Sequence, residues 1–135
     1  MPIKPENKSL YPPDWPEIRI RIRNRAGNRC EGCGIANHLV IKRLVENSYR
    51  TPSSQEWDMI HCKVRYGGYN FTSSIKLHGF IRIVCTVAHR DHDPTNNSDD
   101  NLAFWCQRCH NRYDRAHRNQ TISDSKVKNQ LKLQI

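Results

Sequence analysis

The chain has no apolar run of the roughly 18 residues that a transmembrane helix needs. Residues 1–16 also lack the apolar segment of a secretory signal, because prolines and polar residues fill them. We therefore expect a cytoplasmic protein in a reducing compartment. Disulfides are rare in such a compartment, so the six cysteines are expected to be metal ligands or free thiols.

Apolar and acidic residues are also scarce. Only 36% of the 135 residues are hydrophobic and the mean hydropathy is −0.84, which predicts one domain with a modest core. The 13 acidic residues are far outnumbered by 22 Lys and Arg, which leaves a formal net charge of +9. A charge of this sign favours a polyanionic partner, and we expect that partner to be a nucleic acid.

Four of the cysteines form two CxxC pairs, one in "CEGCG" and one in "CQRCH". A CxxC pair places two thiolates so that both reach one tetrahedral zinc, and two pairs complete a site of four thiolates. Two unrelated buried pairs or a redox pair are the alternatives, but a redox pair would not explain a second copy. We predict a structural zinc bound by Cys30, Cys33, Cys106 and Cys109. Cys62 and Cys85 are expected to be buried or partly exposed thiols.

The N-terminal third combines prolines with a basic repeat. Five of the seven prolines fall within residues 1–16, so residues 1–14 are expected to form an extended arm. In the following "EIRIRIRNRAGNR", isoleucine and arginine alternate as in a strand. Pro16 and Gly27, however, are typical of the start and the end of a helix, with Asp14 as a candidate cap. We predict a helix.

The rest of the chain gives uneven signals. Residues 35–77 are polar and rich in turn residues, and "HLVIKRLV" fits either a short strand or a helical turn. Residues 75–89 are predicted to be a strand because β-branched residues dominate their second half, and residues 101–106, after a turn-rich loop, are a second short strand candidate. A helix is expected to follow from Gln107, since no Gly or Pro interrupts it. Residues 121–135 are expected to form a polar tail.

A second group of polar residues surrounds the later CxxC pair. Asp91 and His92 follow the first of these strands, and His110 and Asp114 lie i, i+4 on the helix. Mixed Asp and His ligands with open positions suit a divalent ion such as Mg²⁺, Mn²⁺, Ni²⁺ or Zn²⁺. We predict that Asp91, His110 and Asp114 bind this second cation, which would leave His92 free to take a proton from water.

These motifs, "RCEGCG" followed by "DHDP", "NL" and "WCQRCHNRYD", resemble the HNH endonucleases. The resemblance covers Cys30 to Cys33 and residues 89–115. It implies an α+β fold, in which a zinc-stapled ββα-metal core over residues 82–118 is combined with an N-terminal helix. The nuclease domain would span residues 15–120, with residues 35–81 as a middle insertion.

The resemblance also implies roles for single residues. Asp91 and His110 match metal ligands, His92 matches the general base, and Asp114 lies where some members have a further ligand. Asn101 matches the asparagine that orients the hairpin loop and the base. The loop between His92 and Asn101 is shorter than in many relatives and lacks their usual Gly pair, so a shifted register in which His89 is the family's first His stays open.

The function expected from the resemblance is hydrolysis of DNA phosphodiester bonds, with double-stranded DNA as the substrate. The arginines expected to hold the phosphate backbone are Arg19, Arg23, Arg29, Arg108, Arg112 and Arg115. Two alternatives stay open: a zinc-stapled nucleic-acid-binding module that does not cut, and an HNH-type ribonuclease. Sequence preference, oligomeric state and the identity of the catalytic ion are not encoded in recognisable motifs.

Overall fold

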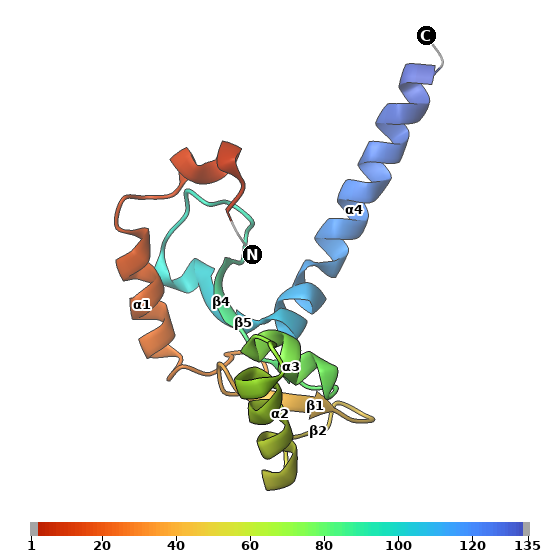
Figure 1. Cartoon of the computed structure of the whole chain (residues 1–135). Helices are drawn as coiled ribbons and strands as arrows, with labels where there is room; N and C mark the ends of the chain where they lie inside the picture. The colour runs from red at the N-terminus through yellow and green to blue at the C-terminus, as the bar shows by residue number, and fades with distance from the viewer. Residues whose placement is uncertain (1–2, 134–135) are drawn as a thin grey trace.

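The computed structural model describes residues 3–133 and shows a small mixed α+β protein (Figure 1). Two short antiparallel sheets carry the strands: one has the order β2-β1-β3 and the other is the hairpin β4-β5. The elements are, in chain order, η1 (Pro5–Leu10), α1 (Trp15–Arg25), β1 (Val40–Arg43), β2 (Tyr49–Arg50), α2 (Ser54–Tyr66), α3 (Phe71–Leu77), β3 (Ile81–Arg82), β4 (Cys85–His89), η2 (Asp99–Asn101), β5 (Leu102–Cys106) and α4 (Gln107–Leu133).

The isoleucine–arginine repeat forms helix α1, as predicted from the proline at its start and the glycine at its end. Trp15, Ile18 and Ile22 are buried on one face of this helix, whereas Ile20 is 49% exposed on another. Pro16 lies in the first turn, and Gly27 follows the helix with a φ of +64° that suits glycine. Asp14 takes the N-cap position, but its side chain makes no capping hydrogen bond.

The main core lies between α1 and the β4-β5 hairpin. All five residues of β5 are buried, and the buried face of α1 packs against this hairpin. Register pairs run from Cys85 opposite Cys106 to His89 opposite Leu102. Each large apolar side chain buried here contributes about 1.5–3 kcal/mol. The first turns of α4 follow this hairpin and contact both of its strands, which gives a strand–strand–helix unit.

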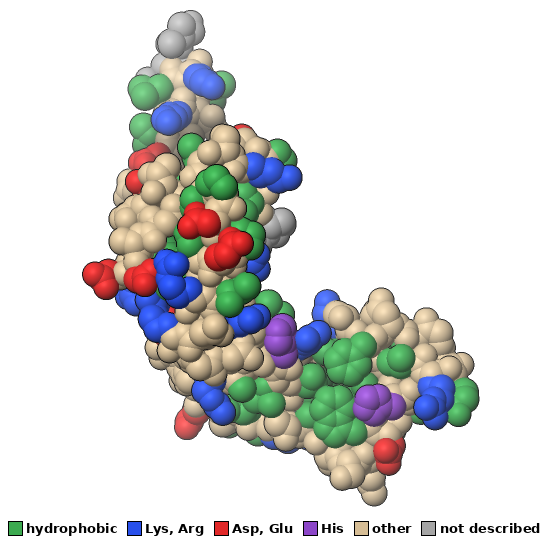
Figure 2. Space-filling model, turned by 90° about the vertical axis from the view of Figure 1, so that its left-hand side faces the viewer, with side chains coloured by type: hydrophobic (Ala, Val, Ile, Leu, Met, Phe, Trp, Pro, Cys, Tyr) green, Lys and Arg blue, Asp and Glu red, His purple; other side chains and the backbone are tan. Residues whose placement is uncertain are grey.

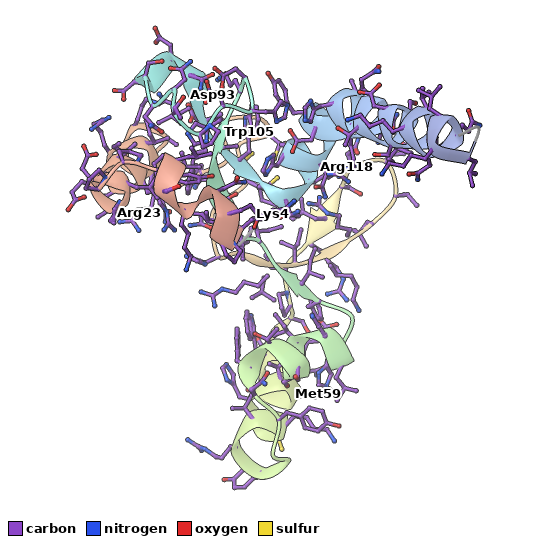
Figure 3. The ribbon with its side chains drawn as sticks, turned by 90° about the horizontal axis from the view of Figure 1, so that it is seen from above. Lys4, Arg23, Met59, Asp93, Trp105 and Arg118 are labelled. Carbon is purple, nitrogen blue, oxygen red and sulfur yellow. The ribbon has the colours of Figure 1, made fainter. Side chains whose placement is uncertain are left out.

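Residues 35–81 hold a second, smaller core. Val40, Ile60, Ile75 and Phe80 are buried together, with Trp57 and Phe71 packed against them. Helix α2 begins with a capping box, in which the Ser53 side chain accepts from the Glu56 N–H and the Glu56 carboxylate accepts from the Ser53 N–H. Helices α2 and α3 form a lobe that extends away from the hairpin and α4, with Met59 on it (Figure 3).

Three of the predicted segments differ from the structure. Residues 75–89 do not form one strand: the end of α3, β3 and β4 share this segment, and Gly79 with a φ of +79° breaks it. The arm contains the 3-10 helix η1, and Tyr11 packs edge-on against Trp15 with ring centroids 5.0 Å apart. Of the polar tail, residues 121–133 continue α4, because nothing in that stretch ends a helix. Residues 1–2 and 134–135 lie outside the described part.

Helix α4 projects away from the rest of the molecule toward the C-terminus (Figure 1), and none of its described residues is buried. Among residues 3–133, no helix combines the length and the apolar character needed to cross a membrane.

Candidate metal centre and histidine–aspartate cluster

Four cysteines from distant parts of the sequence meet beside the main core. Cys30 and Cys33 lie in the loop after α1, Cys106 ends β5, and Cys109 lies in the first turn of α4. Their Sγ atoms are all within 4.8 Å of one another, and those of Cys33 and Cys106 are 3.8 Å apart. Thiolates bound at about 2.3 Å to a tetrahedral zinc are separated by about 3.8 Å. The four thiols therefore fit one zinc ion, as predicted.

The backbone around Cys30 is shaped to accept a charged sulfur. The N–H groups of Gly32 and Cys106 donate to the Cys30 Sγ at 3.3 and 3.2 Å. Burial by itself raises the pKa of Cys30, but these N–H groups and that of Cys33 outweigh burial and lower the pKa to about 7. Gly32 is required here, because a Cβ at this position would lie 2.9 Å from the Cys109 Sγ.

The two other cysteines are not part of this centre. Cys62 is exposed on α2, while Cys85 is buried opposite Cys106 in the hairpin. Burial, and after it the nearby sulfurs of Cys30 and Cys106, raises the pKa of the Cys85 thiol to about 12. Cys85 therefore stays a neutral thiol in the core, as expected for a buried cysteine.

A cluster of histidine and aspartate begins on α4 at the residue after Cys109. The Nε2 of His110 is 2.9 Å from the Oδ2 of Asp114, and the Nε2 of His92 is 3.7 Å from the other oxygen, Oδ1. The His110 and Asp114 side chains are only 19% and 16% exposed. The Nδ1 of His110 and the Oδ1 of Asp114 are buried without a hydrogen-bond partner. Buried polar atoms of this kind are costly unless a ligand or water satisfies them.

His117 extends this cluster along the same face of α4. Its ring stacks on that of His92 with centroids 4.0 Å apart and an interplanar angle of 13°. The sequence interpretation missed His117, although its spacing from His110 and Asp114 places it on their helix face. His92 reaches the cluster from the loop with a φ of +60°, a conformation that few non-glycine residues adopt.

The structure does not bring Asp91 to His110 and Asp114. One Asp91 oxygen accepts from the Asn101 side chain and the Asp93 N–H, and the other accepts from the Asn96 side chain. These hydrogen bonds, led by that from Asn96, lower the pKa of Asp91 to about 2. Its carboxylate therefore organises the loop. His92 of the same loop, rather than Asp91, is the residue that lies near Asp114.

Asn101 and His89 also hold the loop rather than face the cluster. The Asn101 side chain donates to Asp91 and to the Asn96 carbonyl, and it accepts from the Asp91 N–H. The Nε2 of His89 is 2.8 Å from the Asn97 Oδ1, and the ring stacks on Trp15 with centroids 5.2 Å apart. Asn101 thus joins both ends of the loop, while His89 is half-buried between the arm and the hairpin.

The predicted phosphate-binding arginines do not form one surface. Arg19 and Arg23 are exposed on α1, and Arg29 donates to the Gly34 carbonyl beside the cysteine centre. The remaining three line a groove between α4 and the strands β1 and β3; they are Arg108, Arg112 and Arg115. Sequence reasoning missed Arg43 and Arg82, which line the opposite wall, because only the fold places these residues beside α4.

Comparisons with protein-family models, with curated proteins and with solved structures found no match to this chain. A functional assignment therefore depends on the sequence motifs and on the geometry of the two clusters.

Proposed function

We propose that the protein is a metal-dependent endonuclease of the HNH kind that hydrolyses DNA phosphodiester bonds. The observation that carries this proposal is the convergence of His92, His110 and Asp114 beside the cysteine centre, on a strand–strand–helix unit. These residues belong to the motifs whose order along the chain makes the sequence resemble the HNH endonucleases. The net charge of +9 supports a polyanionic substrate.

In this proposal a divalent cation binds between His110 and Asp114, in place of the direct contact between their side chains. Two ligand atoms that each lie about 2.1 Å from a cation, at adjacent coordination positions, are about 3 Å apart. The His110 Nε2 and the Asp114 Oδ2 are separated by 2.9 Å. One imidazole and one carboxylate suit Zn²⁺, Ni²⁺ or Mn²⁺, and Mg²⁺ would depend more on the carboxylate. A cation bound here would stabilise the negative charge that grows on the phosphate during hydrolysis.

We assign His92 as the general base. It reaches the cluster from the loop, with its Nε2 3.7 Å from the Asp114 Oδ1, and in this proposal it takes a proton from the attacking water. Asn101 and Asp91 act through the loop: their hydrogen bonds fix the segment that carries His92. They are positioning residues in this proposal.

The four-cysteine centre has a structural role in the same proposal. Cys109 and His110 are consecutive in the first turn of α4, and Cys106 ends the strand that leads into this helix. A zinc ion bound by all four sulfurs would tie the loop after α1 to the start of α4. It would thereby hold His110 and Asp114 against the hairpin loop.

Supercoiled plasmid incubated with Mg²⁺, Mn²⁺, Ni²⁺ or Zn²⁺ tests the proposal, since nicked and linear products are resolved on a gel. We expect cutting by the wild type with at least one ion. The His92→Ala change should slow cutting by about 10²–10⁴-fold, the usual contribution of a general base, without loss of cation binding. The His110→Ala change should lose cutting together with affinity for the cation.

The matched control is His61→Ala, which removes a histidine stacked on Trp57 in the α2 lobe and should cut like the wild type. Plasmid left intact with every ion would reject the proposal and favour a nucleic-acid-binding module that does not cut. Equal cutting by His92→Ala would reject the assigned base. A labelled RNA cut faster than DNA of the same sequence would favour a ribonuclease.

A further inference from the structure

An open groove of about 600 Å³ lies between α4 and the strands β1 and β3, and arginine dominates its lining. Arg118 lies on the side of α4 that borders this groove (Figure 3). No aspartate or glutamate is among the lining residues. The groove arginines, from both walls, are Arg43, Arg82, Arg108, Arg112, Arg115 and Arg118.

Three of the groove arginines lie on a different face of α4 from the histidine–aspartate cluster. Arg108, Arg112 and Arg115 are spaced i, i+4, i+7, and the cluster repeats that spacing two residues later, from His110. Two residues turn an α-helix by about 200°. These three arginines therefore point away from the cluster, whereas Arg118, which is i+4 from Asp114, lies at the border between the two faces.

The charges in the groove are not compensated by ion pairs. Arginines elsewhere do have acidic partners: Arg21 pairs with Asp99 and Arg25 with Glu31, each at 2.7 Å. Among the described residues, none of the six groove arginines forms such a pair. Arg118 instead donates to the Asn111 side chain at 3.2 Å. Like charges gathered in a concave surface repel one another, and a bound anion relieves this repulsion.

We propose that this groove binds the phosphate backbone of double-stranded DNA, at a face distinct from the histidine–aspartate cluster. Arg108 and Arg118 are ten residues apart, which corresponds to about 15 Å of helix. Phosphates of one DNA strand follow one another about every 3.4 Å along the axis, so a row laid along the axis spans about four phosphate-to-phosphate steps. It is too long for one small anion. Arg82 and Arg43 face the same strand from the opposite wall.

This inference goes beyond the proposed cleavage, because binding in the groove requires neither the cation nor His92. It implies that one chain contacts DNA on two sides of α4. The guanidinium groups contact phosphates and not base edges, so binding here is expected to be independent of base sequence and to weaken steeply as salt rises.

Fluorescence anisotropy with a labelled DNA duplex, at several salt concentrations and without added divalent cation, tests the groove. The test variant combines Arg82→Gln, Arg112→Gln and Arg115→Gln. Loss of three phosphate contacts should lower the slope of log K against log salt by about 2.7, and weaken binding at least tenfold at low salt. Zinc content and circular dichroism confirm that the variant is folded.

The control removes the same charge from the α2–α3 lobe by combining Lys63→Gln, Arg65→Gln and Lys76→Gln, and it should change affinity by less than about twofold. An equal loss of affinity in both variants would show an effect of net charge and would overturn the proposal. Affinity at the wild-type level in the groove variant would overturn it as well. A poly-glutamate probe that binds the groove while the duplex does not would identify an acidic protein as the partner instead. Duplex bound through the groove with plasmid left intact would reject cleavage and leave this inference standing.

Discussion

At the scale of single residues, the cysteine centre depends on each of its four sulfurs. We predict about one equivalent of tightly held zinc in the wild type, measured by mass spectrometry of the metal after dialysis. The Cys106→Ser change should abolish it, because Cys106 is buried and an alcohol replaces a thiolate ligand. Unfolding should then occur at a much lower temperature, since zinc binding is coupled to folding.

Cys62→Ser is the matched control, as Cys62 is exposed and lies on α2 away from the centre. It should keep both the zinc and the melting temperature of the wild type. A zinc-free wild-type protein that folds normally would contradict the predicted centre.

The residue Glu56 provides a prediction for pH. Its carboxylate accepts two hydrogen bonds from the Arg50 guanidinium, at 2.7 and 2.8 Å, and one from the Ser53 N–H. These partners, the guanidinium first, hold the pKa of Glu56 well below its usual range. The group therefore stabilises the folded state above the unfolded-state pKa of about 4.3, and this contribution is lost as the pH falls below that value.

We expect thermal melting of the wild type between pH 5 and pH 2 to show a loss of stability that Glu56→Gln reduces. At pH 7 the variant should melt earlier than the wild type, because the ion pair is absent. Asp58→Asn, at an exposed position on the same helix, should leave the profile unchanged. Parallel pH profiles for Glu56→Gln and the wild type would contradict the assignment.

At the scale of elements, the sequence predicted the structure correctly where residues typical of helix ends were present. Pro16 and Gly27 indicated a helix against the alternation of isoleucine and arginine, and the buried Trp15, Ile18 and Ile22 show why: helical spacing puts these three on the core face. The prediction failed over residues 75–89, where the apolar pattern of a strand spans α3, β3 and β4. The buried Ile75 and Phe80 belong to the α2–α3 core, and only tertiary packing separates them from the hairpin.

The candidate site, like the fold, could be predicted from the sequence only in part. The CxxC spacing identified the four cysteines, because a tetrahedral zinc imposes that spacing. Asp91 shows the limit of such reasoning. Adjacent residues in a loop need not face the same partner, and the Asp91 carboxylate is occupied by hydrogen bonds from Asn96 and Asn101 within the loop. The arginine groove could not be predicted, since its walls come from three elements that only the fold brings together.

Helix α4 gives a prediction for an element. No residue of it is buried, and its later turns project away from the molecule (Figure 1). A helix without tertiary contacts adds little to global stability. Ser125→Pro should therefore reduce the helical circular-dichroism signal without lowering the melting temperature. In the interior of a packed helix, by contrast, a proline lowers the free energy of unfolding by about 3 kcal/mol. The same change at Arg19, inside α1, should lower the melting temperature. A lower melting temperature for Ser125→Pro would indicate that the later turns pack against a partner.

At the scale of the whole molecule, two apolar cores support two different parts of the structure. The core between α1 and the hairpin holds the cysteine centre and the histidine–aspartate cluster, while the core of α2 and α3 supports the separate lobe. Figure 2 shows hydrophobic side chains gathered on the surface of this lobe, where Met59, Tyr66 and Leu77 are more than half exposed. Cys106 and Ile22 share the first core, and Ile60 belongs to the second.

This division predicts a difference between two equivalent core changes. Ile22 and Ile60 are both fully buried, and truncation of either to alanine should cost about 2–5 kcal/mol of local or global stability. Ile22→Ala should weaken zinc retention and plasmid cutting, because α1 packs directly on the hairpin. Ile60→Ala should increase hydrogen exchange in α2 and α3 while zinc content and cutting stay near the wild-type level. Loss of zinc from Ile60→Ala would instead show that the two cores fold as one cooperative unit, with the lobe supporting the metal centre.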